Sequence, residues 1–276
     1  MALAKFKDLS IDANEVMLVG EFWGRALEQE FVYDDDSGTG MLQPGLDDEL
    51  ERTIWINAVP EAKSVKSRVH LDVTVEGGRP ETVGAVTLRE PDDEISWTVA
   101  ADPEGNEFCV FDIDPGDAEE EIEPTEPGLL DLVVDSYEPV KIATWWARVL
   151  DGEVGQNDEG SEAWVTDAVG FPYANWLFVY VPEAKSAKNR IHWDVELAGP
   201  DPKALVDAGA TVVREPDDEI SWWVLNDPEG NEFCAFEHFA PVEKATYRVG
   251  VVFGPSIDGT PPDLPAVEGS WPDDLA

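Results

Sequence analysis

Two histidines each stand two residues before an aspartate, in segments that differ only in detail. His70 and Asp72 lie in RVHLDV, and His192 and Asp194 lie in RIHWDV. Because successive side chains of a strand point to opposite faces, each histidine shares one face with its aspartate, and the apolar residues take the other face. Imidazole and carboxylate groups side by side can exchange protons or bind a metal ion. Both segments are therefore candidate sites of acid–base or metal chemistry.

The two cysteines also stand in equivalent places. Cys109 and Cys234 each end the sequence DPEGNEFC. A thiolate is a nucleophile and a metal ligand, but a cysteine without an assisting base more often serves as a small packing residue. The other candidates have plain alternatives too. The histidines could be hydrogen-bonded polar residues, and the aspartates could pair with nearby arginines, Arg68 and Arg190.

These paired motifs belong to an internal duplication. Residues 89–97 and 214–222 both read REPDDEISW, residues 102–109 and 227–234 both read DPEGNEFC, and VPEAKS occurs at residues 59–64 and 181–186. Repeats at a nearly fixed spacing indicate two copies of one domain. We therefore predict a first domain at residues 1–115, an acidic linker at 116–127, a second domain at 128–240 and a tail rich in proline, glycine and acids at 241–276.

The charge of the chain excludes two classes of partner. Its 276 residues include 60 acidic and 18 basic ones, a formal net charge of −42. Such a field repels nucleic acids and anionic membranes, so neither is an expected partner. No apolar run approaches the roughly 18 residues of a membrane span, and the first residues lack an apolar signal region. We expect a cytoplasmic protein without a disulfide, whose acidic surface would also suit a high-salt cytoplasm.

Hydrophobic periodicity predicts the elements that position the motifs. Strands are expected at residues 5–12, 53–59 and 68–75, and a helix at 15–27, while glycines and a proline break up residues 28–52, where one or two weak strands could hide. In the second copy a short helix at 202–208 ends at Gly209. A hairpin with a tight turn at 102–105 closes the first copy, and a further strand is expected at 246–253. Each copy is thus predicted to contain two consecutive β-α-β-β-β modules.

The order of these motifs resembles the glyoxalase-like group of the vicinal oxygen chelate superfamily, which includes glyoxalase I, the extradiol dioxygenases and the bleomycin-resistance proteins. The motifs are HLDV, GATVVREP and DPEGNEFC, after a helix that carries FW. The resemblance implies an α+β fold in which paired β-α-β-β-β modules form a cupped sheet, with helices outside and a ligand inside. One chain would supply the two cups that relatives often assemble by dimerisation, so we expect a monomer.

Alternation along the strands predicts which residues face a cup. Phe108 and Val110 should pack outward against the helix, whereas Asp8, Ser10 and Asp12 should point inward. REPDDEISW could be a structural loop, and its tryptophan could plug the core instead of lining a cup. The predicted ligand-binding residues are Trp55, Asn57, His70, Asp72, Trp97, Cys109, Phe111, Asp131, His192, Asp194, Trp222, Cys234 and Phe236.

The resemblance also implies where a metal would bind. In metal-dependent members each of four strands gives one ligand, usually His, Gln or Glu. The corresponding residues are Asp8, Asn57, His70 and Cys109 in the first copy and Asp131, Val179, His192 and Cys234 in the second. Only the histidines match, and a catalytic ion needs about three good donors. We expect no resident cofactor and no metal in the first copy. In the second, the candidates for a divalent ion such as zinc are Asp131, His192 and Cys234.

Two functions from different classes remain open. The first is a binding protein whose aromatic-lined cup holds a small organic molecule, as small-molecule sites are mostly apolar with few polar groups. The second is a lyase or isomerase that acts beside a carbonyl, with a divalent metal or with His192 as the base and His70 as the other catalytic candidate. In a third interpretation, one copy is only a structural support for the other.

Overall fold

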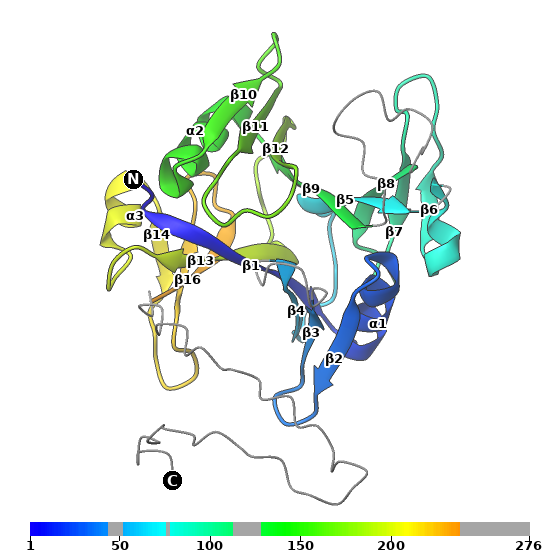
Figure 1. The fold of residues 1–276 in the computed structure, drawn as a ribbon, viewed down its shortest axis with the longest axis horizontal. Helices are drawn as coiled ribbons and strands as arrows, with labels where there is room; N and C mark the ends of the chain where they lie inside the picture. Colours follow the sequence, from blue (N-terminus) through cyan, green and yellow to red (C-terminus); the bar gives the residue numbers. More distant parts are fainter. Residues whose placement is uncertain (44–51, 76–77, 113–127, 238–276) are drawn as a thin grey trace, which may run out of the picture. The chain divides into compact units, whose positions relative to one another are not determined.

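A computed structural model describes residues 1–43, 52–75, 78–112 and 128–237. These residues fall within one compact unit, Met1–His238 (Figure 1). The predicted linker at 116–127, the tail at 241–276 and the strand expected at 246–253 lie outside the described residues.

The two copies fold into matching series of elements. The first copy comprises β1 (Ala4–Ala13), α1 (Val16–Ala26), β2 (Glu30–Asp34), β3 (Thr39–Gln43), β4 (Ile54–Ala58), β5 (Val69–Val75), the 3-10 helix η3 (Pro80–Val83), β6 (Val86–Arg89), β7 (Thr98–Ala101) and β8 (Glu107–Asp112). The second comprises β9 (Gly128–Ser136), α2 (Pro139–Leu150), β10 (Glu153–Gln156), β11 (Glu162–Thr166), β12 (Asn175–Tyr180), β13 (Ile191–Leu197), α3 (Lys203–Ala208), β14 (Thr211–Arg214), β15 (Trp223–Asn226) and β16 (Glu232–Phe236). The predicted α+β fold is confirmed.

The strands form two sheets of eight, and each sheet takes strands from both copies. One has the order β14-β15-β16-β13-β1-β4-β3-β2, and the other has the order β10-β11-β12-β9-β5-β8-β7-β6. The central contacts are antiparallel pairs between the copies, β1 with β13 and β5 with β9. The two copies, residues 1–115 and 128–240, therefore do not each form a sheet of their own. Each sheet joins the first module of one copy to the second module of the other.

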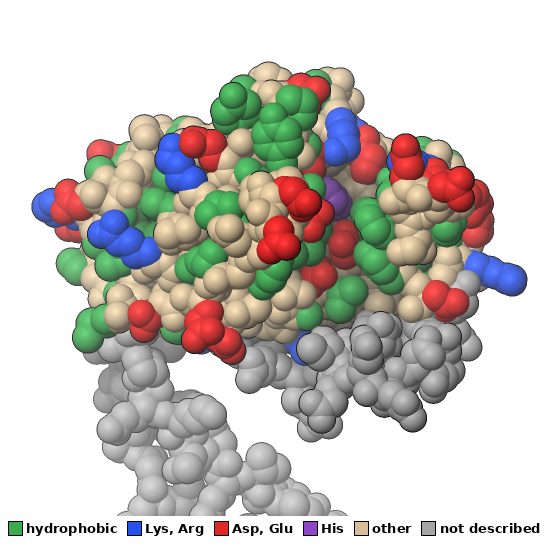
Figure 2. All heavy atoms as spheres, turned by 90° about the horizontal axis from the view of Figure 1, so that it is seen from above, with side chains coloured by type: hydrophobic (Ala, Val, Ile, Leu, Met, Phe, Trp, Pro, Cys, Tyr) green, Lys and Arg blue, Asp and Glu red, His purple; other side chains and the backbone are tan. Residues whose placement is uncertain are grey.

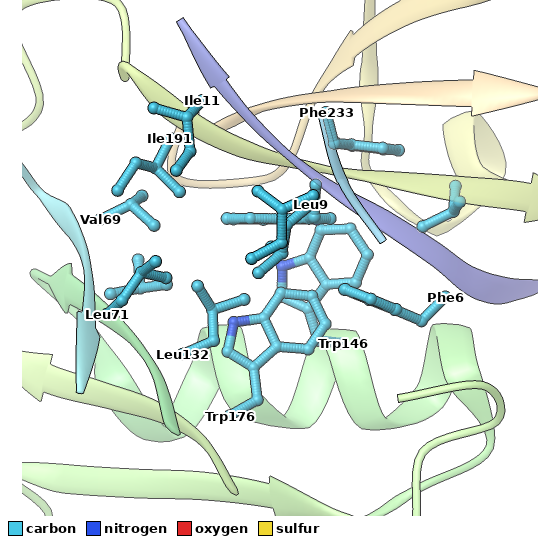
Figure 3. Packing of buried hydrophobic residues seen from close by; sticks show 14 of the residues in the cluster. Phe6, Leu9, Ile11, Val69, Leu71, Leu132, Trp146, Trp176, Ile191 and Phe233 are labelled. Atoms are coloured by element: carbon cyan, nitrogen blue, oxygen red, sulfur yellow. The ribbon is translucent and has the colours of Figure 1, made fainter. Parts of the chain in front are cut away.

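The hydrophobic core lies between the two sheets. Leu9 and Ile11 of β1 and Ile191 of β13 meet Val69 and Leu71 of β5 (Figure 3), and all five are at most 1% exposed. This arrangement follows from alternation, because the apolar residues of the central strands share one face of each sheet. The opposite face of each sheet is left for polar residues, and it forms a cup.

Helices α1 and α2 bridge the sheets through aromatic side chains. Trp146 of α2 contacts Trp176 of β12 in one sheet and Trp193 of β13 in the other, with ring centroids 4.8 and 5.3 Å apart. In the same way, Trp23 of α1 lies 5.0 Å from Phe108 of β8. Phe108 therefore packs against the helix, as the sequence predicts.

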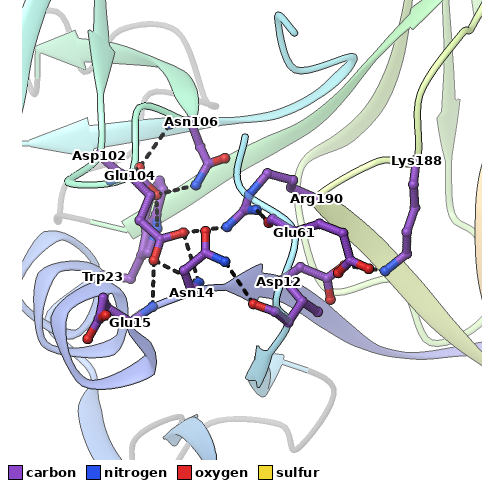
Figure 4. Close-up of polar contacts among 11 residues, drawn as sticks. Asp12, Asn14, Glu15, Trp23, Glu61, Asp102, Glu104, Asn106, Lys188 and Arg190 are labelled. Carbon is purple, nitrogen blue, oxygen red and sulfur yellow. Dashed lines mark hydrogen bonds and ion pairs between the residues drawn. The ribbon is translucent and has the colours of Figure 1, made fainter. Parts of the chain in front are cut away.

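The repeated DPEGN turn holds the start of the helix in the same copy. Asp102 accepts hydrogen bonds from the backbone N–H groups of Glu104 and Asn106 and from the indole of Trp23 (Figure 4). The carboxylate of Glu104 accepts the N–H of Glu15, one residue before α1, at 2.7 Å. Such contacts stabilise a helix start because its first N–H groups have no partner within the helix. The identity of the two DPEGN segments thus has a structural cause.

The REPDDEISW segments form surface loops closed by their own arginines. Arg89 binds Asp92 and Glu94, and Arg214 makes the same contacts with Asp217 and Glu219. These side chains are exposed, which supports the interpretation of this motif as a structural loop. Among the described residues, no helix is long and apolar enough to cross a membrane.

Candidate functional site: two polar cups

We name as cup A the polar face of the sheet that contains β1 and β13. Its floor is built from Asp8 and Asp12 of β1, His192 and Asp194 of β13, and Cys234 of β16. Asp8 stands opposite Asp194 in the antiparallel register, and Asp194 is level with Cys234 in the parallel one. The carboxylates of the floor are buried, with Asp194 only 5% exposed. Strand register alone therefore places a histidine, a thiol and carboxylates together.

Cup B is the equivalent face of the sheet that contains β5 and β9. Asp72 stands opposite Asp131 and is level with Cys109, and His70 lies two residues before Asp72 on β5. The floors of the two cups therefore match position by position, although each floor mixes residues of both copies.

The exchange of modules divides the ligand sets that the sequence suggested. Asp131 lies in cup B, away from His192 and Cys234, and Asp8 lies in cup A, away from His70 and Cys109. Of the remaining positions, Asn57 lies beside Asp12 in the sheet of cup A, and Val179 lies beside Asp135 in the sheet of cup B. The ligand sets were divided wrongly because β5 and β13 carry nearly identical motifs. Either strand could pair with β1 or β9 in the same register.

An aromatic pair stands beside the floor of each cup. Trp222 stacks on Phe236 in cup A with ring centroids 5.4 Å apart, and Trp97 stacks on Phe111 in cup B at 5.7 Å. All four rings are partly exposed, so these tryptophans form walls and do not plug the core. Cup A has a further aromatic residue, Trp55, whose indole donates a hydrogen bond to Asp8.

A family model, the glyoxalase-like domain, matches residues 8–111 and 131–236. The chain belongs to this glyoxalase-like family. Among solved structures, glyoxalase I from Zea mays aligns with a TM-score of 0.57 at 11% identity, covering 85% of this chain and 92% of that one. A putative dioxygenase from Bacillus subtilis aligns with a TM-score of 0.55 at 14% identity, covering 86% of each chain. No curated protein matches the chain. At these identities the solved structures show a shared fold.

In cup A of this glyoxalase-like protein, His192 is held in its charged form. Its Nε2 lies 3.4 Å from Asp12 Oδ1, and Asp12 also binds Lys188. Burial alone would lower the pKa of His192, but the hydrogen bond and the charge of Asp12 oppose it, and the pKa is raised to about 10. The pKa of Asp12 is lowered, since these two cations overcome the effect of burial. At neutral pH, His192 is in the form of an acid and not of a base.

In cup B the histidine is shifted in the opposite direction. Burial lowers the pKa of His70 to about 4, so its ring is neutral at neutral pH. Burial and the neighbouring charge of Asp131 raise the pKa of Asp72 to about 7. Burial also raises the pKa of Asp131, despite hydrogen bonds from the backbone and side chain of Asn175. Asp72 and Asp131 therefore resist carrying two negative charges together.

The thiols are poor nucleophiles in both cups. Burial raises the pKa of Cys109 and that of Cys234, and the thiolate is the reactive form. Both are free cysteines, one in each sheet.

The donors of each cup lie close enough together to share one metal ion. The donor atoms of His70, Asp72 and Cys109 lie within 4.8 Å of one another, and the same holds for His192, Asp194 and Cys234. Within the described part of the chain, one buried oxygen of Asp72 and one of Asp194 have no hydrogen-bond partner. The number of donors therefore fits a zinc ion. An ion would displace the proton of the thiol in each cup and that of the imidazole in cup A, so its binding would release protons.

Sequence reasoning placed Asp12 inside a cup but did not identify it as the partner of His192. It also did not predict that Lys7, Lys66 and Lys188 bind aspartates of the cups. Arg68 and Arg190 do not pair with Asp72 and Asp194, because they turn to backbone carbonyls of the other copy, those of Glu183 and Glu61. The only sequence signal for Asp12 was the alternation of side chains along β1, which predicts that Asp12 points into a cup.

A crevice of about 680 Å³ lies where the two EAKS segments approach each other, and Asp12 and Asp135 are among its lining residues. Lys66 and Lys188 line it, each bound to an aspartate that belongs to a cup, Asp135 and Asp12 respectively. The crevice lacks the histidines, the cysteines and the stacked rings, so we take the cups as the candidate sites. Figure 2 shows one face of the molecule, with a histidine visible between acidic side chains.

Proposed function

We propose that this glyoxalase-like protein binds a small organic molecule in its cups, in the manner of the bleomycin-resistance proteins that the sequence resembles. The observation that supports this most is the buried oxygen of Asp194, and the equivalent oxygen of Asp72, that lacks a partner among the described residues. An unsatisfied buried oxygen costs about 1–3 kcal/mol, and a ligand that donates a hydrogen bond would recover it. The stacked tryptophan of each cup offers the apolar surface that ligand pockets need.

The proposal includes no resident metal. The thiols resist ionisation and His192 is occupied by Asp12, so a bound ion would first have to displace protons in both cups. It also includes a monomer, because one chain contributes the two modules of each sheet. A cytoplasmic location is part of the same proposal and agrees with two free thiols.

A metal-dependent lyase or isomerase is the second candidate. It is favoured by the grouping of His, Asp and Cys donors within 4.8 Å in each cup. His70, Asp72 and Cys109 would hold the ion better than their counterparts, because His70 is already neutral. A bound ion would supply a Lewis acid for a substrate carbonyl oxygen.

Calorimetric titration with naphthalene-based ligands, before and after dialysis against a chelator, tests the first function. We expect saturable binding that the chelator leaves unchanged and that Trp222→Ala or Trp97→Ala weakens about tenfold or more, since stacking contributes ~1–3 kcal/mol. Tyr137→Ala, at an exposed ring outside both cups, is the control. Absence of any saturable binding would refute the proposal.

Elemental analysis separates the two candidates. We expect less than one equivalent of any divalent metal in the dialysed protein. One equivalent that is lost in His70→Ala, or in His192→Ala, would favour the second function and would assign it to cup B or to cup A.

A further inference from the structure

We propose that the two cups have diverged in ligand class, cup A for an organic acid that presents a carboxylate and cup B for an uncharged molecule. This rests on the proposed function, because it assumes that the cups bind small organic molecules. Four differences between matching positions support it.

The first difference is at a β-bulge that both copies share. In the pairing of β1 with β13 the register shifts between Phe6 and Asp8, which leaves Lys7 as the extra residue. In the pairing of β9 with β5 the register shifts between Leu129 and Asp131, which leaves Leu130 as the extra residue. Bulges redirect a side chain and are common beside active sites. The same structural device therefore presents a cation in cup A and an aliphatic group in cup B.

The Lys7 side chain reaches the binding surface of cup A. Its ammonium lies 4.8 Å from the ring centroid of Phe236, the wall residue, and it also contacts Asp8. An ammonium has three N–H donors, and Asp8 takes one of them. Asp8 is also bound by the indole of Trp55, so its charge is shared. Lys7 thus has donors left for the carboxylate of a ligand in cup A.

The second difference is the partner of the histidine. His192 is paired with Asp12, whereas no described contact joins His70 to Asp135, which binds Lys66 at 2.6 Å. The carboxylate that reaches the histidine in cup A is therefore taken by a lysine in cup B.

The third difference is the balance of carboxylates. Asp8 of cup A pairs with Lys7, whereas its counterpart Asp131 of cup B is bound by Asn175. Cup A also has Glu196 opposite Lys5 in the register, where cup B has Thr74 opposite Gly128. The other aspartates match, since Asp12 pairs with Lys188 as Asp135 pairs with Lys66. Cup A therefore has lysines at two positions where cup B has none.

The fourth difference lies on the last strand of each first module. Trp55 and Asn57 of β4 in cup A are matched by Leu177 and Val179 of β12 in cup B, as their registers against β1 and β9 show. Cup A thus has the amide of Asn57 and the indole of Trp55, whose N–H is bound to Asp8, where cup B has only aliphatic groups. Polar donors discriminate between ligands far more strongly than apolar contacts do.

The test uses a matched pair of ligands, 1-naphthoate and 1-naphthalenemethanol, titrated calorimetrically into the whole protein at neutral pH. We expect one naphthoate site in the parent. Lys7→Leu should weaken naphthoate about tenfold or more and leave the alcohol within about twofold. The reciprocal change, Leu130→Lys, should add a second naphthoate site. Lys203→Leu removes an exposed lysine on α3 with the same change of charge, and it should leave both ligands unaffected.

The outcomes separate this inference from the proposed function. If neither ligand binds the parent saturably, the proposed function fails and the inference fails with it. If both ligands bind, and Lys7→Leu weakens them equally or Leu130→Lys adds no naphthoate site, the division between the cups is wrong and the proposed function stands.

Discussion

His192 and His70 occupy equivalent positions of the two copies, yet their surroundings give them opposite charge states. The groups that face His192 are Asp12, Asp194 and Cys234, with Lys188 behind Asp12. The ion pair with Asp12 more than offsets burial, whereas His70 has only burial and distant charges. A single contact between side chains thus separates two sites that the sequence presents as copies.

At the residue scale, the prediction is a wide separation of the two imidazole titrations. Since the pKa of His192 is raised above its ordinary 6.5, pairing with Asp12 stabilises the fold fully below about pH 6.5, and this contribution is lost as pH rises through about 10. NMR titration should show His192 charged at pH 8 and His70 neutral down to about pH 5. Asp12→Asn should lower the pKa of His192 and reduce the loss of stability between about pH 6.5 and about pH 10. Coincident titration of both rings would contradict the assignment.

At the element scale, the strands that could be predicted are those with one buried face. Residues 5–12 and 68–75 alternate because β1 and β5 are central, which predicted both the strands and the side chains that point into the cups. Strands β2 and β3, between residues 28 and 52, could not be located in this way. β2 forms a sheet edge and has no buried residue, so it carries no apolar alternation.

The structural role of the DPEGN turn gives a prediction at the same scale. Glu104 accepts backbone N–H groups at the start of α1 and contacts Arg190, and its side chain is only 10% exposed. Glu104→Ala should destabilise the protein by about 1–2 kcal/mol, as the loss of a helix cap does. Glu219→Ala, in an exposed loop, should change the stability by less than about 1 kcal/mol. Urea unfolding followed by circular dichroism would measure both, and equal effects would disprove the capping role.

The acidic surface is a property of the whole molecule. A net charge of −42 destabilises a compact state through repulsion, which salt screens. Raising the salt from 0.1 to 1 M shortens the Debye length from about 10 to about 3 Å. We expect the melting temperature to rise across that range. A melting temperature that stays constant would mean that repulsion does not limit stability.

The pairing of modules could not be predicted from the sequence, although the modules themselves could. β5 and β13 carry HLD and HWD at matching positions, so β1 could join either strand with the same faces buried. Local patterns specify which face is buried, but they do not specify which copy supplies the neighbour. That choice decides which aspartate meets which histidine, and with it the composition of both cups.

The exchange of modules predicts how the molecule behaves when its chain is cut between the copies. A specific protease site placed within residues 116–127 would separate the first copy from the second. Because β1 pairs with β13 and β5 with β9, parting the fragments would split both eight-stranded sheets at their centres and expose the core beneath. The cleaved fragments should therefore elute together in size-exclusion chromatography under native conditions and separate only in denaturant. Two fragments that separate without denaturant, each retaining its circular dichroism, would show that each copy closes on itself.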